Sequence, residues 1–128
     1  MTTDITVEVP ASPEFVRILR AVAAGVAARL DFPYDTIDDL RMAVDEASAQ
    51  LLRFSATASA LRMRLSPGDR RVAVVVSIDA RGLDGSWPPP DAERSLAWQV
   101  LSGLADEAGF ELDDGVPAVR LVKHGETR

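Results

Sequence analysis

The sequence predicts an α+β fold, a two-layer sandwich in which three helices pack on one face of a mainly antiparallel sheet of four or five strands. Two observations carry this prediction. Two long segments in the first half repeat apolar residues at three- and four-residue steps, which is the period of an amphipathic helix. Shorter segments, most of them in the second half, alternate apolar and polar residues or run apolar between turn residues, as strands do. The resulting order of elements is β-α-α-β-β-α-β-β.

The first elements are a short strand and a long helix. Residues 4–9 alternate apolar and polar side chains and are expected to form a strand that ends at Pro10. A helix is expected over residues 13–30, because Ser12 can cap its first free N–H groups and Pro13 needs no donor at the first helical position.

The second helix and the first hairpin follow. The helix is expected to begin at Asp35 or Thr36, either of which could cap it, and to continue to about residue 54. Residues 60–66 and 71–80 are expected to pair as a hairpin, since the Pro-Gly-Asp-Arg sequence between them is typical of a tight connection. The second of these strands reads Val-Ala-Val-Val-Val-Ser-Ile, which predicts a central strand.

The last third begins with an irregular segment. Residues 81–94 are rich in glycine and proline, and no regular structure is expected there. Residues 95–108 repeat apolar side chains at helical spacing and predict a third helix, which Gly109 would close. Residues 110–112 and 116–124 are expected to form a final hairpin around an Asp-Asp-Gly turn.

Composition limits the classes of function. A chain of 128 residues fits a single domain over residues 1–128, and its 47% hydrophobic content is too high for intrinsic disorder. Cysteine is absent, which excludes disulfides, thiolate zinc sites and thiol nucleophiles. A net charge of −6 argues against binding nucleic acid or an anionic membrane surface. The N-terminus has no signal-peptide pattern and no apolar run is long enough to cross a bilayer, so a cytoplasmic location is expected.

The second predicted helix carries the first candidate site. Glu46 and Gln50 lie one helical turn apart, about 40° around the helix axis, and Arg53 falls close to both. This trio flanks the apolar stripe, so it is expected beside the sheet. A carboxylate there could act as a general base, and an amide oxygen could help to hold a metal ion. The alternative interpretation is an ordinary polar helix edge with a Glu–Gln contact.

Asp79 is the second candidate, since it ends the most hydrophobic strand and is followed by Gly82 and Gly85. An acid at a strand end can accept a hydrogen bond from the exocyclic amine of a base, and nearby glycines let the backbone approach a ligand. The alternative is an aspartate that initiates a turn. Of the two tryptophans, Trp87 is interpreted as a lid or contact residue and Trp98 as a core residue at a helix boundary.

The segment Leu-Arg-Met-Ala-Val-Asp-Glu-Ala at residues 40–47, together with the order of elements, resembles the anti-sigma-factor serine kinases of the Bergerat-type (GHKL, histidine-kinase-like ATPase) superfamily. In that family a helix carrying Leu-x-x-Ala-Val-x-Glu-Ala-x-x-Asn is followed by a hairpin, a glycine-rich lid and a helix that closes the ATP site. The resemblance implies a histidine-kinase-like ATPase fold, with ATP and magnesium as cofactors.

The resemblance also implies roles for single residues. Glu46 matches the family's general base for phosphoryl transfer to a serine of an antagonist protein. Gln50 stands where the family has a magnesium-binding asparagine, and it offers the same amide oxygen one methylene further out. Asp79 matches the aspartate of the Asp-x-Gly-x-Gly motif, which contacts adenine.

Two departures from the family pattern predict weak or absent nucleotide binding. Arg81 and Leu83 occupy the glycine positions after the strand, so Gly82 and Gly85 could serve only if the loop changed register. The glycine motif that opens the last helix is also missing, because residues 94–98 read Arg-Ser-Leu-Ala-Trp. Glycines at these places let backbone N–H groups surround phosphates at the start of a helix.

These observations lead to three hypotheses. The first is an anti-sigma factor that sequesters a sigma factor, is countered by an anti-anti-sigma antagonist and has weakened or lost nucleotide binding. The second is an active ATP-dependent protein-serine kinase that phosphorylates the anti-anti-sigma factor. The third is an interaction domain whose likeness to the family is coincidental, which the order of the strands would reveal. The resemblance further implies a homodimer.

Overall fold

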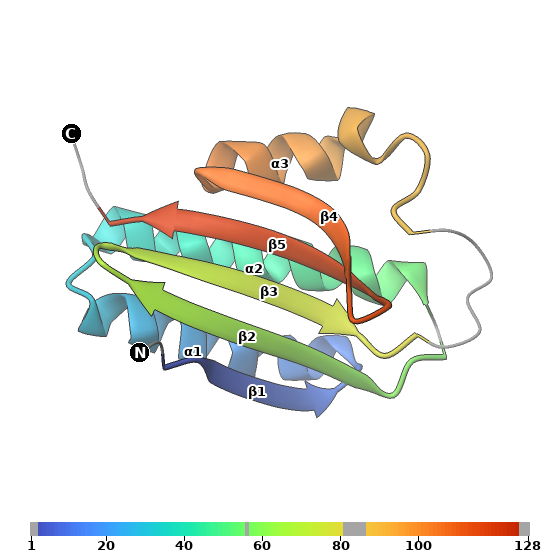
Figure 1. Ribbon diagram of the computed structural model, residues 1–128, viewed down its shortest axis with the longest axis horizontal. Helices are drawn as coiled ribbons and strands as arrows, with labels where there is room; N and C mark the ends of the chain where they lie inside the picture. Colours follow the sequence, from blue (N-terminus) through green and yellow to red (C-terminus); the bar gives the residue numbers. More distant parts are fainter. Residues whose placement is uncertain (1–2, 56, 81–86, 126–128) are drawn as a thin grey trace.

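The computed structural model describes residues 3–55, 57–80 and 87–125, which form a five-stranded sheet with α-helices on one of its faces (Figure 1). Two short 3₁₀ turns precede the first and the last helix. The elements are β1 (Ile5–Pro10), α1 (Val16–Arg29), α2 (Tyr34–Phe54), β2 (Ala60–Gly68), β3 (Arg71–Ile78), α3 (Leu96–Leu104), β4 (Glu107–Asp113) and β5 (Val116–His124).

The strands lie in the order β1-β2-β3-β5-β4, and every neighbouring pair is antiparallel. The two hairpins, β2–β3 and β4–β5, meet because β5 pairs with β3, so β3 is the central strand. The predicted order of elements, the antiparallel sheet and the central position of the Val-rich strand are therefore confirmed.

The core lies between the sheet and the helices. In β3, alternate residues starting at Val72 and ending at Ile78 point toward the helices and are almost fully buried, because side chains along a strand alternate between the two faces. From α2, Leu40, Val44 and Leu51 are buried against them, as the apolar stripe predicted. Each large apolar side chain buried in this way contributes roughly 1.5–3 kcal/mol.

Turn chemistry fixes the register of the final hairpin. Asp113 pairs with Val116, which leaves a two-residue loop of Asp114 and Gly115. Both loop residues have positive φ angles, 53° and 81°, the conformation that Asp-Gly loops adopt between strongly twisted strands. The predicted turn is confirmed, and with it the pairing that brings β4 to the edge of the sheet.

The prediction of a third helix over residues 95–108 is wrong at its C-terminal end. The helix ends at Leu104, and β4 begins at Glu107, so the last predicted turn of helix is strand. Pairing with β5 provides the reason. The backbone N–H of Asp106 donates to the carbonyl of Val122 (2.9 Å), and its Oδ2 accepts from the N–H of His124 (2.7 Å). These sheet contacts outweigh the local helical pattern.

The predicted helix caps also differ from those observed. The second helix begins at Tyr34, directly after Pro33, and no side chain caps it, although Asp35 lies in its first turn. Ser12 likewise makes no side-chain cap hydrogen bond where the first helical segment begins. Pro33 presets the extended entry into α2, and an acidic residue near a helix N-terminus is favourable without a direct cap.

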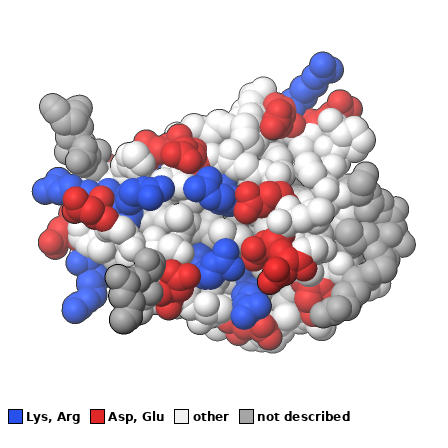
Figure 2. Space-filling view, in the orientation of Figure 1, with Lys and Arg blue, Asp and Glu red and all other residues white. Residues whose placement is uncertain are grey.

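The second face of the sheet carries no helix in the described part of the chain, and Figure 2 shows basic and acidic side chains interspersed across it. Two of its ion pairs connect strands. Arg120 on β5 pairs with Glu107 on the neighbouring β4 (3.5 Å), and Arg64 on β2 pairs with Asp113 at the end of β4, two strands further across the sheet (3.2 Å). Among residues 3–55, 57–80 and 87–125, no helix has both the length and the apolar character needed to cross a bilayer.

Candidate functional site

The predicted trio on α2 is in contact. The side-chain amide of Gln50 donates from Nε2 to Oε2 of Glu46 at 3.1 Å, and Nη2 of Arg53 lies 3.4 Å from the same oxygen. The Glu46 side chain is 27% exposed, whereas that of Arg53 is 63% exposed. The carboxylate is thus oriented by two donors from its own helix and still reaches solvent, the geometry that either a general base or a simple polar edge can have.

A small cavity lies next to Gln50. Its volume is about 240 Å³, and it is bounded by α2, by the segment before α3 and by β4. Most of its lining is apolar. The lining residues are Gln50, Trp87, Pro89, Pro90, Asp91, Ala92, Ser95 and Phe110. The described part of the proline-rich segment therefore lies beside Gln50 of α2.

Trp87 is the most extensively anchored residue described along the wall of this cavity. Its indole is only 7% exposed, and its Nε1–H group donates to the carbonyl oxygens of Glu111 (2.9 Å) and Ala118 (3.1 Å). Its ring meets those of Phe54 and Phe110 edge-on, with centroids 5.0 and 5.7 Å apart. Trp87 is therefore a buried anchor between α2 and the β4–β5 hairpin. The sequence offered lid and contact roles but carried no local signal for this long-range packing.

The start of α3 satisfies part of its own hydrogen-bonding capacity. The Oγ atom of Ser95 accepts from the backbone N–H of Trp98 at 3.1 Å and donates to the carbonyl of Ala92 at 2.6 Å. Ser95 is thus a side-chain N-cap, which was not foreseen. One of the N–H groups that could face an anion at this helix start is occupied by the chain itself.

Asp79 is held at the end of β3 by its neighbours on β2. Its Oδ1 accepts from the N–H groups of Ser59 (2.9 Å) and Ala60 (2.8 Å), and its Oδ2 accepts from the Ser59 hydroxyl (2.6 Å). Burial raises the pKa of Asp79, but the hydrogen bonds from the Ser59 hydroxyl and from nearby backbone N–H groups outweigh that effect. Its pKa consequently lies below the ordinary value, and the carboxylate is charged at neutral pH.

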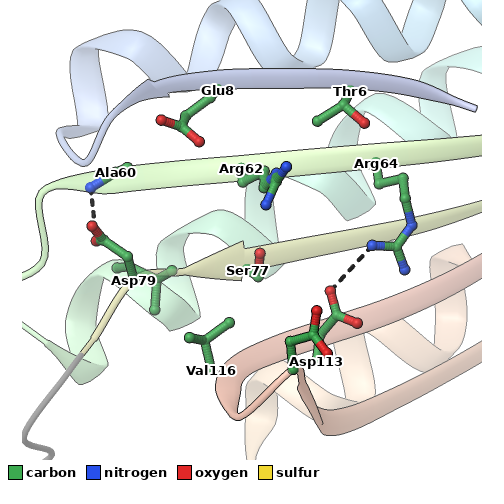
Figure 3. A pocket seen from close by; sticks show the side chains of 11 residues that line it. Thr6, Glu8, Ala60, Arg62, Arg64, Ser77, Asp79, Asp113 and Val116 are labelled. Atoms are coloured by element: carbon green, nitrogen blue, oxygen red, sulfur yellow. Dashed lines mark hydrogen bonds and ion pairs between the residues drawn. The ribbon is translucent and has the colours of Figure 1, made fainter.

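Asp79 and Gln50 line different cavities. Asp79 borders a hollow of about 510 Å³ on the helix-free face of the sheet, together with Arg62 and Ser77 (Figure 3). Ile78 and Ala80 on either side of Asp79 belong to the hydrophobic core, whereas Asp79 borders the hollow. The structure thus brings Glu46 and Gln50 together but sets Asp79 apart from them.

Comparison with known proteins decides the family. The model of the histidine kinase-like ATPase domain matches residues 9–123 of the chain. The chain belongs to the histidine kinase-like ATPase domain family. It is 28% identical to the serine-protein kinase RsbW of Bacillus subtilis, over 94% of this chain and 84% of that protein. It is 27% identical to RsbW of Bacillus licheniformis, over 88% of this chain and 80% of the relative.

A solved structure shows the same fold. The RsbU and RsbW domains of a Mycobacterium tuberculosis protein superpose on the chain with a TM-score of 0.70 at 17% sequence identity. The match covers 96% of this chain and 32% of the other, so the chain spans about a third of that protein's length. The fold predicted from the resemblance is confirmed, and a coincidental likeness is excluded.

For a member of the histidine kinase-like ATPase domain family, ATP with magnesium is the expected ligand. The roles predicted for Glu46, Gln50 and Asp79 toward that ligand stay predictions. Gly82 and Gly85 lie outside the described residues. Within the described ranges, no three His, Asp or Glu side chains gather in a group that could hold a metal ion.

Proposed function

We propose that this chain is an anti-sigma regulatory factor that sequesters a sigma factor by direct protein contact. An antagonist of the anti-anti-sigma type would compete for it and release the sigma factor. The observation that carries the proposal is the family match over residues 9–123, combined with 27–28% identity to RsbW proteins along most of their length. The net charge of −6 favours a protein partner over nucleic acid. We also infer that it acts in the cytoplasm.

We further infer that nucleotide binding is weak or absent. The cavity beside Gln50, at about 240 Å³, is smaller than the roughly 300–1,000 Å³ of typical ligand pockets. Its lining is mostly apolar, whereas a triphosphate needs polar donors. Ser95 already occupies one N–H group at the start of α3, where family members would present backbone to phosphate. The described residues therefore fit magnesium and a triphosphate poorly.

Binding of purified proteins tests both statements. Each sigma factor of the host would be titrated into the chain by isothermal titration calorimetry. One series contains no nucleotide, and the other contains about 1 mM Mg-ATP, a concentration far above the Kd of a tight nucleotide complex. We expect at least one sigma factor to bind. Its Kd for the chain should be the same, within about threefold, with and without nucleotide. The purified antagonist should then displace it. Failure of every sigma factor to bind would refute the anti-sigma role.

A homodimer is the proposed assembly, and the helix-free face of the sheet is consistent with it. Acidic and basic side chains alternate across that face, so a second copy could meet it without a repulsive patch (Figure 2). Sedimentation equilibrium of the purified chain measures the mass directly. A monomer at micromolar concentration would contradict the proposal.

The second candidate is an active protein-serine kinase, and the contact between Glu46 and Gln50 favours it. In this case the proton of a serine hydroxyl on the antagonist would pass to the Glu46 carboxylate as the γ-phosphoryl group leaves ATP, giving phosphoserine and ADP. Gln50 would help to hold magnesium, whereas Asp79, which lines a separate hollow, would contact adenine only after leaving its hydrogen bonds with Ser59 and Ala60. Phosphate incorporation into the antagonist, followed by mass spectrometry, tests this directly. The test variant is Glu46→Gln, which should abolish phosphoryl transfer to the antagonist. The matched control is Glu107→Gln, on the helix-free face of the sheet, which should leave the transfer unchanged.

A further inference from the structure

Trp87 has an environment that resembles the one a protein builds for a bound heteroaromatic ring. Its N–H edge faces the carbonyl oxygens of Glu111 and Ala118, and two aromatic rings, Phe54 and Phe110, pack against it edge-on. Planar ligands are commonly held in this way, by a few backbone polar groups and by aromatic neighbours. Here the ring belongs to the chain itself.

We propose that Trp87 is a built-in occupant of the inner end of the site beside Gln50, so that the site is closed from within. This inference rests on the proposed loss of nucleotide binding and gives it a cause. Trp87, which is 7% exposed, lines the cavity between α2, the proline-rich segment and β4. A planar ligand can enter further only if the indole leaves.

The indole cannot leave without loss, because the contacts on both sides of it are specific. Moving it would break the hydrogen bonds that the Nε1–H group donates to the carbonyl oxygens of Glu111 and Ala118. It would also separate α2 from the β4–β5 hairpin at Phe54 and Phe110. The ligand class that could replace it is a flat heteroaromatic molecule with an N–H donor, such as indole or the base of a purine nucleoside.

Truncation of the side chain tests the occupancy. The variant Trp87→Ala should bind indole, and more weakly adenosine, with a saturable rise in Tm of several degrees at millimolar ligand, whereas the unmodified chain should show no rise. The control is Trp98→Ala, because Trp98 is only partly buried and contacts Phe110 without reaching the two carbonyl groups. Equal responses of both variants, or of the unmodified chain, would overturn the proposal.

A second experiment does not depend on the folding of the truncated variant. The chain has two tryptophans, so Trp98→Phe leaves Trp87 as the single indole reporter. Its emission should be blue-shifted, resistant to iodide quenching and unchanged by 2 mM Mg-ATP, with no heat of binding. Easy quenching, or nucleotide binding that leaves the Trp87 emission blue, would show that the indole does not fill the site. Sigma-factor binding by the unmodified chain is measured in parallel, and failure of every sigma factor to bind would count against the anti-sigma role alone.

Discussion

Replacement of Asp79 by alanine should destabilise the protein by about 2 kcal/mol. The variant loses three hydrogen bonds to a carboxylate, two from backbone N–H groups and one from the Ser59 hydroxyl. Hydrogen bonds to charged groups contribute roughly 1.5–3 kcal/mol each when buried, but these lie near the surface, where water can replace the lost acceptor. The total loss in the free energy of unfolding is therefore closer to that expected for one buried hydrogen bond than for three.

Replacement of Asp79 by asparagine tests how much of its stabilising effect comes from the negative charge of the carboxylate. The amide oxygen can take the place of Oδ1, which accepts from Ser59 and Ala60, while the amide nitrogen faces the Ser59 hydroxyl. The charge is lost, and the Ser59 hydroxyl, which donates to Oδ2 in the unmodified chain, would instead have to accept from the amide nitrogen. Asp79→Asn should therefore cost about 1 kcal/mol at pH 7, roughly half of the alanine effect. The control is Asp69→Asn, in the exposed turn between β2 and β3, which should change stability by less than about 0.5 kcal/mol.

The pH dependence of this difference follows from the lowered pKa of Asp79. A carboxyl group whose pKa is depressed in the folded state stabilises the fold fully above its unfolded pKa, and this contribution is lost as the pH falls through the folded value. The difference in the free energy of unfolding between the unmodified chain and Asp79→Asn should therefore be constant above about pH 5 and shrink below about pH 4.

Urea unfolding followed by circular dichroism measures both effects. With a slope of about 1–3 kcal/mol per molar urea, the alanine variant should unfold at a midpoint about 1 M lower. Two results would refute the reasoning. One is an alanine variant as stable as the unmodified chain. The other is a gap for asparagine that stays the same from pH 7 to pH 3. Either would mean that the carboxylate is not held by β2 and is available to a ligand.

Two further predictions concern α3. Ser95→Ala should lower the stability by about 1 kcal/mol, because the N–H of Trp98 loses its cap, whereas Ser102→Ala on the exposed side of the same helix should be neutral or slightly stabilising in thermal unfolding. Lys123→Met should cost about 1–2 kcal/mol, since Nζ donates to the carbonyl of Leu104 at 2.7 Å and caps the end of the helix. Methionine keeps the length of the side chain, so a loss confined to thermal stability, with unchanged partner binding, is the expected pattern.

Local patterns in the sequence were sufficient for most elements. The period of three to four residues placed α1 and α2, and the Asp-Gly pair placed the turn of the last hairpin, because these signals depend on residues close in sequence. The end of α3 was missed because it depends on pairing with β5, which the helical spacing of residues 95–108 does not report. Trp87 was missed for the same reason, since all of its partners are distant in sequence.

Contacts within the candidate site could be predicted where the periodicity of the chain is regular, and less well where a motif was matched by its letters. Glu46 and Gln50 are adjacent on a long helix, so their contact follows from helical geometry. Gln50 also lines a cavity together with residues of the proline-rich segment. What the sequence could not report is that Trp87 is buried at this cavity, because burial of an indole depends on the whole fold.

Asp79 shows that a motif residue at the end of a strand has to be assigned to one face of the sheet as well as matched by its sequence. Side chains alternate between the two faces, so an offset of one residue moves a functional group to the opposite side of the sheet. Alignment on the aspartate of Asp-x-Gly-x-Gly selects Asp79, but the residue that packs toward the helices is Ala80, and counting from Ala80 places Gly82 at the first glycine position. In that register a methyl group takes the place that the resemblance assigns to the adenine-contacting aspartate. The proposed weakening of nucleotide binding therefore has a second support that does not depend on the closure proposed for Trp87.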